Sequence, residues 1–159
     1  HCSCWMCSFH GETRSYAEAD AKFTYDMKEV VMCPSGRTEK VVIPEGVTSL
    51  RDHAFYMVDE LQEYEFPSTL TYIGEECFAQ TYHLNSFTIP NSVTSTGEDI
   101  FYSSGLKSIT IGTGLTEIAP GSFDSTSVDN VVIPGNVKKI GESAFGFNSK
   151  LTSVTFNEV

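Results

Sequence analysis

The sequence contains no long hydrophobic run. Its longest apolar stretches, such as residues 41–43, are only a few residues long. A membrane-spanning helix needs about 20 consecutive apolar residues, and the core of a signal peptide needs about 7 to 15. The sequence therefore predicts no membrane insertion, and its 40% of hydrophobic and 19% of charged residues are typical of one soluble folded domain.

Basic residues are scarce as well. The 159 residues include 10 Lys and Arg against 21 Asp and Glu, which gives a formal net charge of −11. Nucleic acids and anionic membrane surfaces bind basic protein faces, so this charge argues against both as partners. Basic or neutral partners are favoured instead.

Catalytic motifs are also absent. The four histidines have neither the spacing of a helix-borne metal pair nor that of a nucleophile's partner, and the glycines of residues 111–121 form no G-x-G-x-x-G loop. We therefore predict a non-enzymatic protein without a cofactor. An enzyme whose catalytic part lies outside these residues is an alternative.

Five cysteines are present, and three of them, Cys2, Cys4 and Cys7, stand close to His10. Structural zinc sites usually draw their ligands from two separated pairs, so no metal is assigned to this cluster. A metal site, a disulfide and a chemically idle segment all stay open. Free thiols would favour the cell interior, and a disulfide within residues 2–7 would favour export.

A repeat of 22 to 23 residues dominates the rest of the chain. Phenylalanines recur at intervals of 23, 23, 22 and 22 residues, at Phe55, Phe78, Phe101, Phe123 and Phe145. A second apolar column, usually followed by Pro, keeps the same register at Ile43, Phe66, Ile89, Ile111, Ile133 and Phe156. Such self-similarity is the signature of stacked repeats.

Each repeat carries the period-2 pattern of a short strand with one buried face. In the second repeat we expect these inward side chains: Leu61, Tyr64, Phe66, Leu70, Ile73, Cys77 and Phe78. A unit of this size cannot bury its apolar face alone, whereas stacked units bury it against each other. The sequence therefore predicts a mainly β solenoid.

The region before the repeats is expected to cap the solenoid. Residues 23–33 alternate apolar and polar around a polar turn, which predicts a β-hairpin over the open end of the core. Residues 11–22 have a weakly helical composition and are expected as a short helix or a linker. The chain thus divides into a Cys-rich segment 1–22, a hairpin cap 23–37 and a solenoid 38–159 of about five and a half repeats.

The column pattern L-x-x-φ-x-φ-P-x-x-V-x-x-I-G-x-x-A-F, in which φ is apolar, resembles the BspA-like leucine-rich repeats. Residues 66–78 (FPSTLTYIGEECF), 89–101 (IPNSVTSTGEDIF) and 133–145 (IPGNVKKIGESAF) carry the likeness most closely. The resemblance implies a right-handed leucine-rich-repeat solenoid in a cell-surface or secreted protein with a role in adhesion. Four positions depart from the pattern and leave the shape of their coils open, namely Arg51, Thr96, Gly112 and Ala119.

The outward strand positions form the candidate ligand-binding face. They are mostly short and polar: Lys40, Val42, Glu63, Glu65, Ser86, Thr88, Ser108, Thr110, Asn130 and Val132. Such a face is expected to be flat and continuous, and its rigidity suits recognition of a protein or glycan. Aromatic residues on the outer loops compete with it as a binding surface: Tyr56, Tyr82, Tyr102 and Phe147.

Carboxylates line another edge of the predicted solenoid. They recur two positions after the buried Ile column, as Asp52, Glu75, Glu98 and Glu142. Strands of neighbouring coils lie about 4.8 Å apart, so such carboxylates could share a calcium ion. A solvated edge that keeps the stack soluble is the favoured interpretation.

The last repeat predicts one further property. Val137, Ile140 and Phe145 are expected to face water beside an unpaired strand edge, unless further repeats follow. Such surfaces invite self-association at the C-terminal end of the solenoid.

The predicted function is a non-enzymatic binding module that contacts a protein, or a glycan, of a host or neighbouring cell. The cell-surface location and the adhesive role are implied by the resemblance, whereas the repeat columns themselves predict a rigid solenoid with an exposed strand face. An intracellular scaffold or structural spacer is the alternative.

Overall fold

The computed structural model describes residues 13–16, 21–24, 28–33, 40–58, 60 and 62–158. The cysteine cluster at Cys2, Cys4 and Cys7 lies outside these residues, as does the predicted core residue Leu61. Within the described part, no helix is long and apolar enough to cross a membrane.

The described residues form strands and turns, without a helix. The N-terminal strands are β1 (Thr13–Tyr16), β2 (Ala21–Thr24) and β3 (Glu29–Met32). One row of the solenoid then consists of β4 (Val41–Val42), β6 (Tyr64–Glu65), β8 (Ser86–Thr88), β10 (Ser108–Thr110), β12 (Asn130–Ile133) and β14 (Ser153–Phe156). The other row consists of β5 (Ser49–Leu50), β7 (Tyr72–Ile73), β9 (Ser95–Thr96), β11 (Glu117–Ile118) and β13 (Lys139–Ile140).

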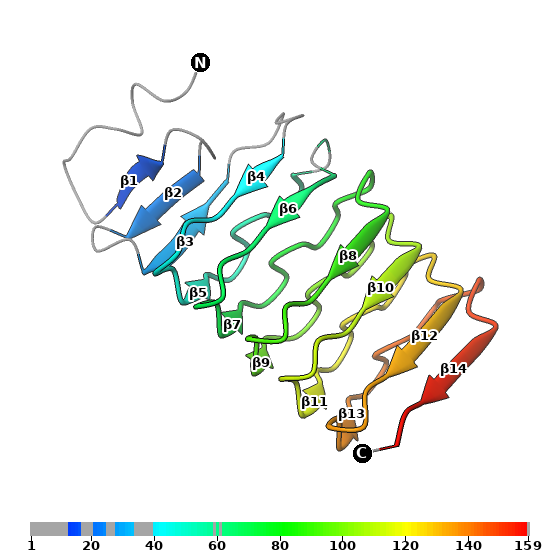
Figure 1. Cartoon of the computed structure of the whole chain (residues 1–159). Coiled ribbons are helices and arrows are strands. Elements are labelled where there is room, and N and C mark those ends of the chain that lie inside the picture. The colour runs from blue at the N-terminus through cyan, green and yellow to red at the C-terminus, as the bar shows by residue number, and fades with distance from the viewer. Residues whose placement is uncertain are drawn as a thin grey trace.

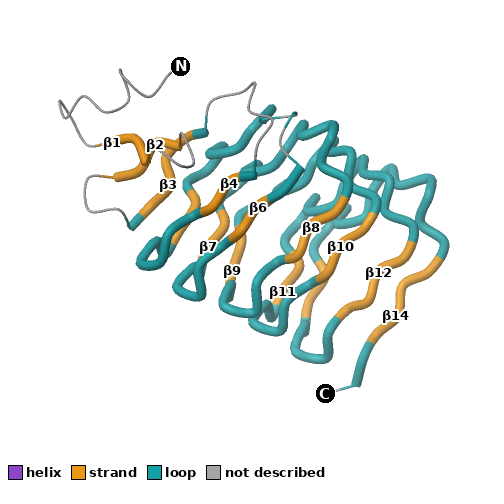
Figure 2. The backbone as a smooth tube through the Cα atoms, turned by 45° about the horizontal axis from the view of Figure 1, so that its top comes forward, coloured by secondary structure: helices purple, strands orange, loops and turns teal. Residues whose placement is uncertain are grey.

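The two rows run along the length of the molecule as a solenoid (Figure 1). Each coil contributes one strand to each row, and loops join the rows at the edges (Figure 2). Pairing between coils is parallel and joins residues one repeat apart, as in Val41 with Tyr64 and Val131 with Val154. The predicted mainly β solenoid of 22 to 23-residue coils is confirmed.

The N-terminal strands form the expected cap. β2 pairs antiparallel with β3, and β3 continues in parallel into β5, where Val30 lies opposite Leu50. Val30 is fully buried, so the hairpin covers core residues of the first coil.

The helix or linker expected within residues 11–22 is wrong in part. Residues 13–16 form strand β1, which pairs antiparallel with β2. Pairing with a neighbouring strand overrides a weak local helix propensity.

The core follows the predicted columns. Phe55, Phe78, Phe101 and Phe123 are at most 1% exposed, and their rings stack on one another with centroids 5.2 to 5.7 Å apart. Cys77 is fully buried, as predicted, and burial raises the pKa of its thiol. Phe145 continues the stack, with its ring 5.2 Å from that of Phe123, so the stack runs from the first to the fifth coil.

Backbone hydrogen bonds also tie the outer loops of neighbouring coils together. The amides of Phe55, Phe78 and Phe101 donate to the carbonyls of Cys77, Ile100 and Ser122 over 2.8 to 3.0 Å. Two residues of each loop adopt positive φ although most are not glycine, such as His53 and Met57 in the first coil. The loops therefore repeat one fixed conformation.

The last described coil exposes apolar side chains, as expected. Ile140 is 39% and Phe156 65% exposed, and Val137 and Phe145 are half-buried. Among the described strands β14 pairs with β12 alone. Together with Ile133, Val137, Ile140 and Phe156 line a hollow of about 290 Å³.

We expect the chain of residues 1–159 to self-associate through this surface, because exposed apolar side chains lie beside an unpaired strand edge. Light scattering over a concentration series should show a rising mean mass. Phe156→Asp should reduce the association, whereas Phe147→Asp, at a 91% exposed loop position, should not. A strictly monomeric chain at all concentrations would contradict the prediction.

Candidate ligand-binding face

The predicted outward positions lie on one face of the row from β4 to β14. All ten are exposed except Val42, which is half-buried. In β12 the alternation is complete, since Asn130 and Val132 are exposed and Val131 and Ile133 are buried. The structure therefore brings the predicted face together, although exposure alone assigns no ligand.

The face is not continuous, and this part of the prediction is wrong. Among the described residues, β4 pairs with β6, β8 with β10 and β12 with β14, but no ladder joins β6 to β8 or β10 to β12. No backbone hydrogen bond connects residues 62–66 with residues 85–90. β6 and β8 also stand visibly farther apart than β8 and β10 (Figure 1).

Aromatic side chains border the opening between β6 and β8. Tyr64, Phe66 and Phe87 occupy inward positions that hold Val or Ile in the first and fifth coils. The Phe87 ring lies 5.6 Å from Phe66, 6.0 Å from Tyr64 and 4.8 Å from Phe78. Three rings from two neighbouring coils therefore gather between β6 and β8 and pack against the Phe column.

Two predicted core residues of the second coil are less buried than expected. Tyr64 and Phe66 were expected to be inward residues like their neighbours, but both are only half-buried. They pack against the core with one side and border the opening with the other.

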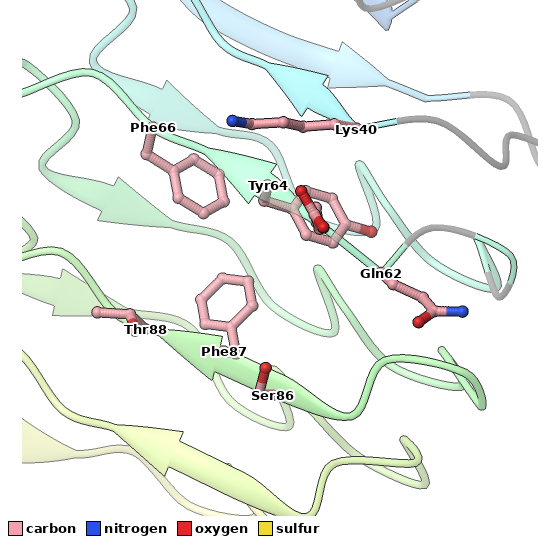
Figure 3. A pocket seen from close by; sticks show the side chains of 8 residues that line it. Lys40, Gln62, Tyr64, Phe66, Ser86, Phe87 and Thr88 are labelled. Carbon is pink, nitrogen blue, oxygen red and sulfur yellow. The ribbon is translucent and has the colours of Figure 1, made fainter.

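The opening between β6 and β8 is a hollow of about 250 Å³, which we call the aromatic hollow. Tyr64, Phe66 and Phe87 approach one another across it (Figure 3). Among the described residues its lining is Lys40, Gln62, Glu63, Tyr64, Phe66, Ser86, Phe87 and Thr88. Four of these residues belong to the predicted binding face, namely Lys40, Glu63, Ser86 and Thr88, and Glu65 lies beside them as the ion-pair partner of Lys40.

The Tyr64 hydroxyl is buried, and no described residue offers it a hydrogen bond. Burial raises the pKa of Tyr64, so the hydroxyl stays neutral. A buried polar group without a partner costs stability, and Val or Ile at this position would avoid that cost. Tyr64 therefore makes the core next to the aromatic hollow less stable than Val or Ile would at this position.

The two glutamates on β6 and beside it are not equivalent. Lys40 Nζ lies 2.5 Å from Glu65 Oε2, and this hydrogen bond, together with the charge of Glu65, raises the pKa of Lys40. The Glu63 carboxylate has no hydrogen-bond or ion-pair partner among the described residues. The ion pair of Lys40 and Glu65 joins diagonal positions of neighbouring strands, which the aligned columns of the sequence do not reveal.

The acidic edge is present but shows no metal geometry. Asp52, Glu75, Glu98 and Glu142 are exposed, and Asp52 accepts a hydrogen bond of 2.8 Å from the Glu75 amide. Burial, and then the neighbouring carboxylates, raise the pKa of Asp99. No three acidic, histidine or cysteine side chains of the described residues are placed to hold a metal ion.

The outer loops expose a separate set of apolar side chains. Tyr82 is 53%, Tyr102 39% and Phe147 91% exposed. Tyr56 is half-buried, and its hydroxyl accepts a hydrogen bond of 2.9 Å from Gln80. Met57, which is not among the predicted loop aromatics, is 48% exposed in the same loop as Tyr56.

The model of the BspA type leucine rich repeat region matches residues 32–158 in six copies. The chain belongs to this family. The resemblance seen in the repeat columns is thereby confirmed, and the fold is one that typically serves non-enzymatic roles. A search of curated proteins found no match for this BspA-type chain.

Solved structures share the fold. The pneumococcal vaccine antigen PcpA is 21% identical with a TM-score of 0.72, and the match covers 93% of this chain and 39% of that one. A leucine-rich repeat protein from Eubacterium ventriosum is 20% identical with a TM-score of 0.85, with 93% and 40% covered. A leucine rich cell surface protein from Faecalibacterium prausnitzii is 18% identical with a TM-score of 0.59, with 95% and 56% covered. The BspA-type chain thus spans about two fifths of the first two structures.

Proposed function

We propose that the BspA-type chain is a non-enzymatic binding module of a cell-surface or secreted protein, which holds a protein ligand on its strand face. One observation carries the proposal. The strand ladder opens between β6 and β8, and the opening presents aromatic rings and an unpaired carboxylate on a face that is otherwise lined by short polar side chains.

The construction of the face favours binding. The strands rest on a continuous stack of buried phenylalanines, and backbone hydrogen bonds hold the loops between coils. A rigid face loses little conformational entropy when a ligand binds, so weak individual contacts suffice. Aromatic side chains are also the usual anchors of protein interfaces, and the aromatic hollow supplies them where the outward columns have none.

The proposed location draws support from a similar protein. The Faecalibacterium prausnitzii protein is described as a cell surface protein, and its fold is shared by this chain. The formal net charge of −11 fits a neutral or basic partner.

Charge reversal at the strand face should weaken ligand binding. In Glu63→Lys/Glu65→Lys two carboxylates beside the aromatic hollow become cations, so we expect several-fold lower capture of biotin-labelled cell-surface proteins on the immobilised chain. The melting temperature should stay nearly unchanged, because exposed ion pairs such as that of Lys40 and Glu65 contribute about 1 kcal/mol or less.

Glu98→Lys/Glu142→Lys is the matched control. It makes the same change of net charge at exposed positions of the acidic edge, and capture should stay at the level of the unmodified chain. Equal capture by all three proteins would remove the strand face from consideration and leave the exposed loop aromatics as the binding surface.

A further inference from the structure

We propose that the aromatic hollow between β6 and β8 is a pocket for a single arginine side chain of a protein ligand. The inference rests on the proposed binding function and deepens it, because it names the chemical group that the strand face recognises. Size, the chemistry of the walls and charge each support it.

The size of the aromatic hollow fits one side chain. Its volume of about 250 Å³ is below the roughly 300–1,000 Å³ that is usual for pockets of drug-sized molecules and cofactors. It lies on an exposed face between two strands rather than inside the solenoid, so a group projecting from a second protein can enter it.

The walls combine aromatic rings with polar groups. Half-buried Tyr64 and Phe66 border the opening, and the ring of Phe87 lies beneath them, 5.6 Å from that of Phe66. A guanidinium group stacks on such rings, and the methylene stem of arginine covers apolar surface. Ser86 and Thr88 at the rim add neutral hydrogen-bonding groups.

Charge selects a cation. The Glu63 carboxylate at the rim has no hydrogen bond or ion pair with a described residue, whereas Lys40 forms an ion pair with Glu65 at 2.5 Å. The hydrogen bond and the charge of Glu65, and then the charge of Glu63, raise the pKa of Lys40. The lining together with Glu65 therefore carries a net charge of −1, from two glutamates and one lysine. Arginine can donate two hydrogen bonds to one carboxylate, which a lysine ammonium does with less defined geometry. A neutral sugar could also stack on the rings and donate hydroxyl hydrogen bonds to Glu63, but it would leave the negative charge uncompensated.

The test uses N-acetyl-L-arginine amide as the probe and the ¹⁵N-labelled chain of residues 1–159 as the receptor. In a titration followed by NMR, we expect saturable shifts of the backbone amides of residues 63–66 and 86–88, with a dissociation constant in the millimolar range. N-acetyl-citrulline amide has nearly the same shape without the charge and should bind at least about fivefold more weakly, since hydrogen bonds to charged groups are the stronger ones.

Two variants predict effects of opposite sign. Glu63→Gln keeps the shape of the side chain and removes its charge, and it should weaken the binding of the arginine probe about five- to tenfold. Lys40→Met removes the competing cation and frees Glu65, so it should strengthen binding about two- to fivefold. Glu98→Gln is the matched control on the acidic edge and should leave binding unchanged.

Three results would overturn the inference: no saturable shifts at residues 63–66 and 86–88, equal binding of the citrulline probe, or stronger shifts of the same amides with methyl β-galactoside, which would assign the aromatic hollow to a glycan. If the arginine probe does not bind while capture of cell-surface proteins still depends on Glu63 and Glu65, the assignment of an arginine pocket is wrong and the proposed function stands. If arginine binds as expected while the charge-reversed chain captures normally, the pocket stands and the proposed function is wrong.

Discussion

Phe101→Ala is expected to lower the free energy of unfolding by about 3–5 kcal/mol, as is usual for truncation of a fully buried phenylalanine. Phe101 is 0% exposed, and its ring stacks on Phe78 at 5.6 Å and on Phe123 at 5.7 Å. It also makes an edge-to-face contact with Phe87, with ring centroids 4.8 Å apart. Alanine would leave a cavity bordered by its own coil and by the coils on both sides, so the loss includes contacts above and below.

Tyr102→Ala is the matched comparison one residue further along the loop. Tyr102 is 39% exposed, and its loss should cost about 0.5 kcal/mol or less, as for most surface substitutions. Urea unfolding curves of the three proteins measure both values, provided that the slopes agree. Phe101→Leu should fall between the two variants. Equal losses for Phe101→Ala and Tyr102→Ala would mean that the assigned core register is wrong.

The fold was predictable because every coil packs the same kinds of side chains at the same positions. A column such as Phe55 to Phe123 must fill the same place in every coil, so the spacing of 22 to 23 residues reveals the stack without knowledge of any contact. The alternation of exposed Asn130 and Val132 with buried Val131 and Ile133 follows from the strand period of two.

The aromatic hollow could not be predicted in the same way. A column pattern treats Tyr64, Phe66 and Phe87 as equivalent to Val or Ile, and it records neither the volume of a ring nor its orientation. The pairing of two strands depends also on the size and orientation of the side chains that pack between them. A signal was nevertheless present, because Tyr64, Phe66 and Phe87 gather three aromatic residues at inward positions of only two neighbouring coils.

The charge pair and the loop conformation were missed for different reasons. Lys40 directly precedes β4, and Glu65 lies on β6, where Val41 is paired with Tyr64. The two side chains therefore meet diagonally, and a comparison of columns covers only directly aligned positions. His53, Glu76 and Asp99 adopt positive φ although they are not glycine, so the sequence gives no signal of this backbone conformation. Hydrogen bonds between the loops, such as that from the Phe55 amide to the Cys77 carbonyl, hold this conformation, and they form only once the coils are stacked.

Gly105→Ala is expected to destabilise the chain by about 3 kcal/mol, at the upper end of the usual cost of overpacking. An ideal Cβ at Gly105 would stand 1.9 Å from the Tyr82 carbonyl oxygen and 2.7 Å from its carbonyl carbon. Both atoms belong to the backbone of the preceding coil, so no side-chain rotation can relieve the contact. The loop of residues 101–106 is one residue shorter than that of residues 78–84, and glycine permits the close approach.

Gly146→Ala is the control, because its nearest atom is Asp124 Oδ2 at 3.0 Å, the end of a flexible side chain. This variant should change stability by less than about 1 kcal/mol, since the lower entropy of the unfolded chain offsets a small strain. Thermal melting should separate the two by roughly 6–12 °C at about 2–4 °C per kcal/mol. Hydrogen exchange locates the effect: the Gly105 amide donates to the Thr81 carbonyl over 3.1 Å, and its protection should fall in Gly105→Ala. Equal melting temperatures of both variants, with unchanged protection at residue 105, would contradict the prediction. They would show that the backbone at Tyr82 lies farther from Gly105 than the structure places it.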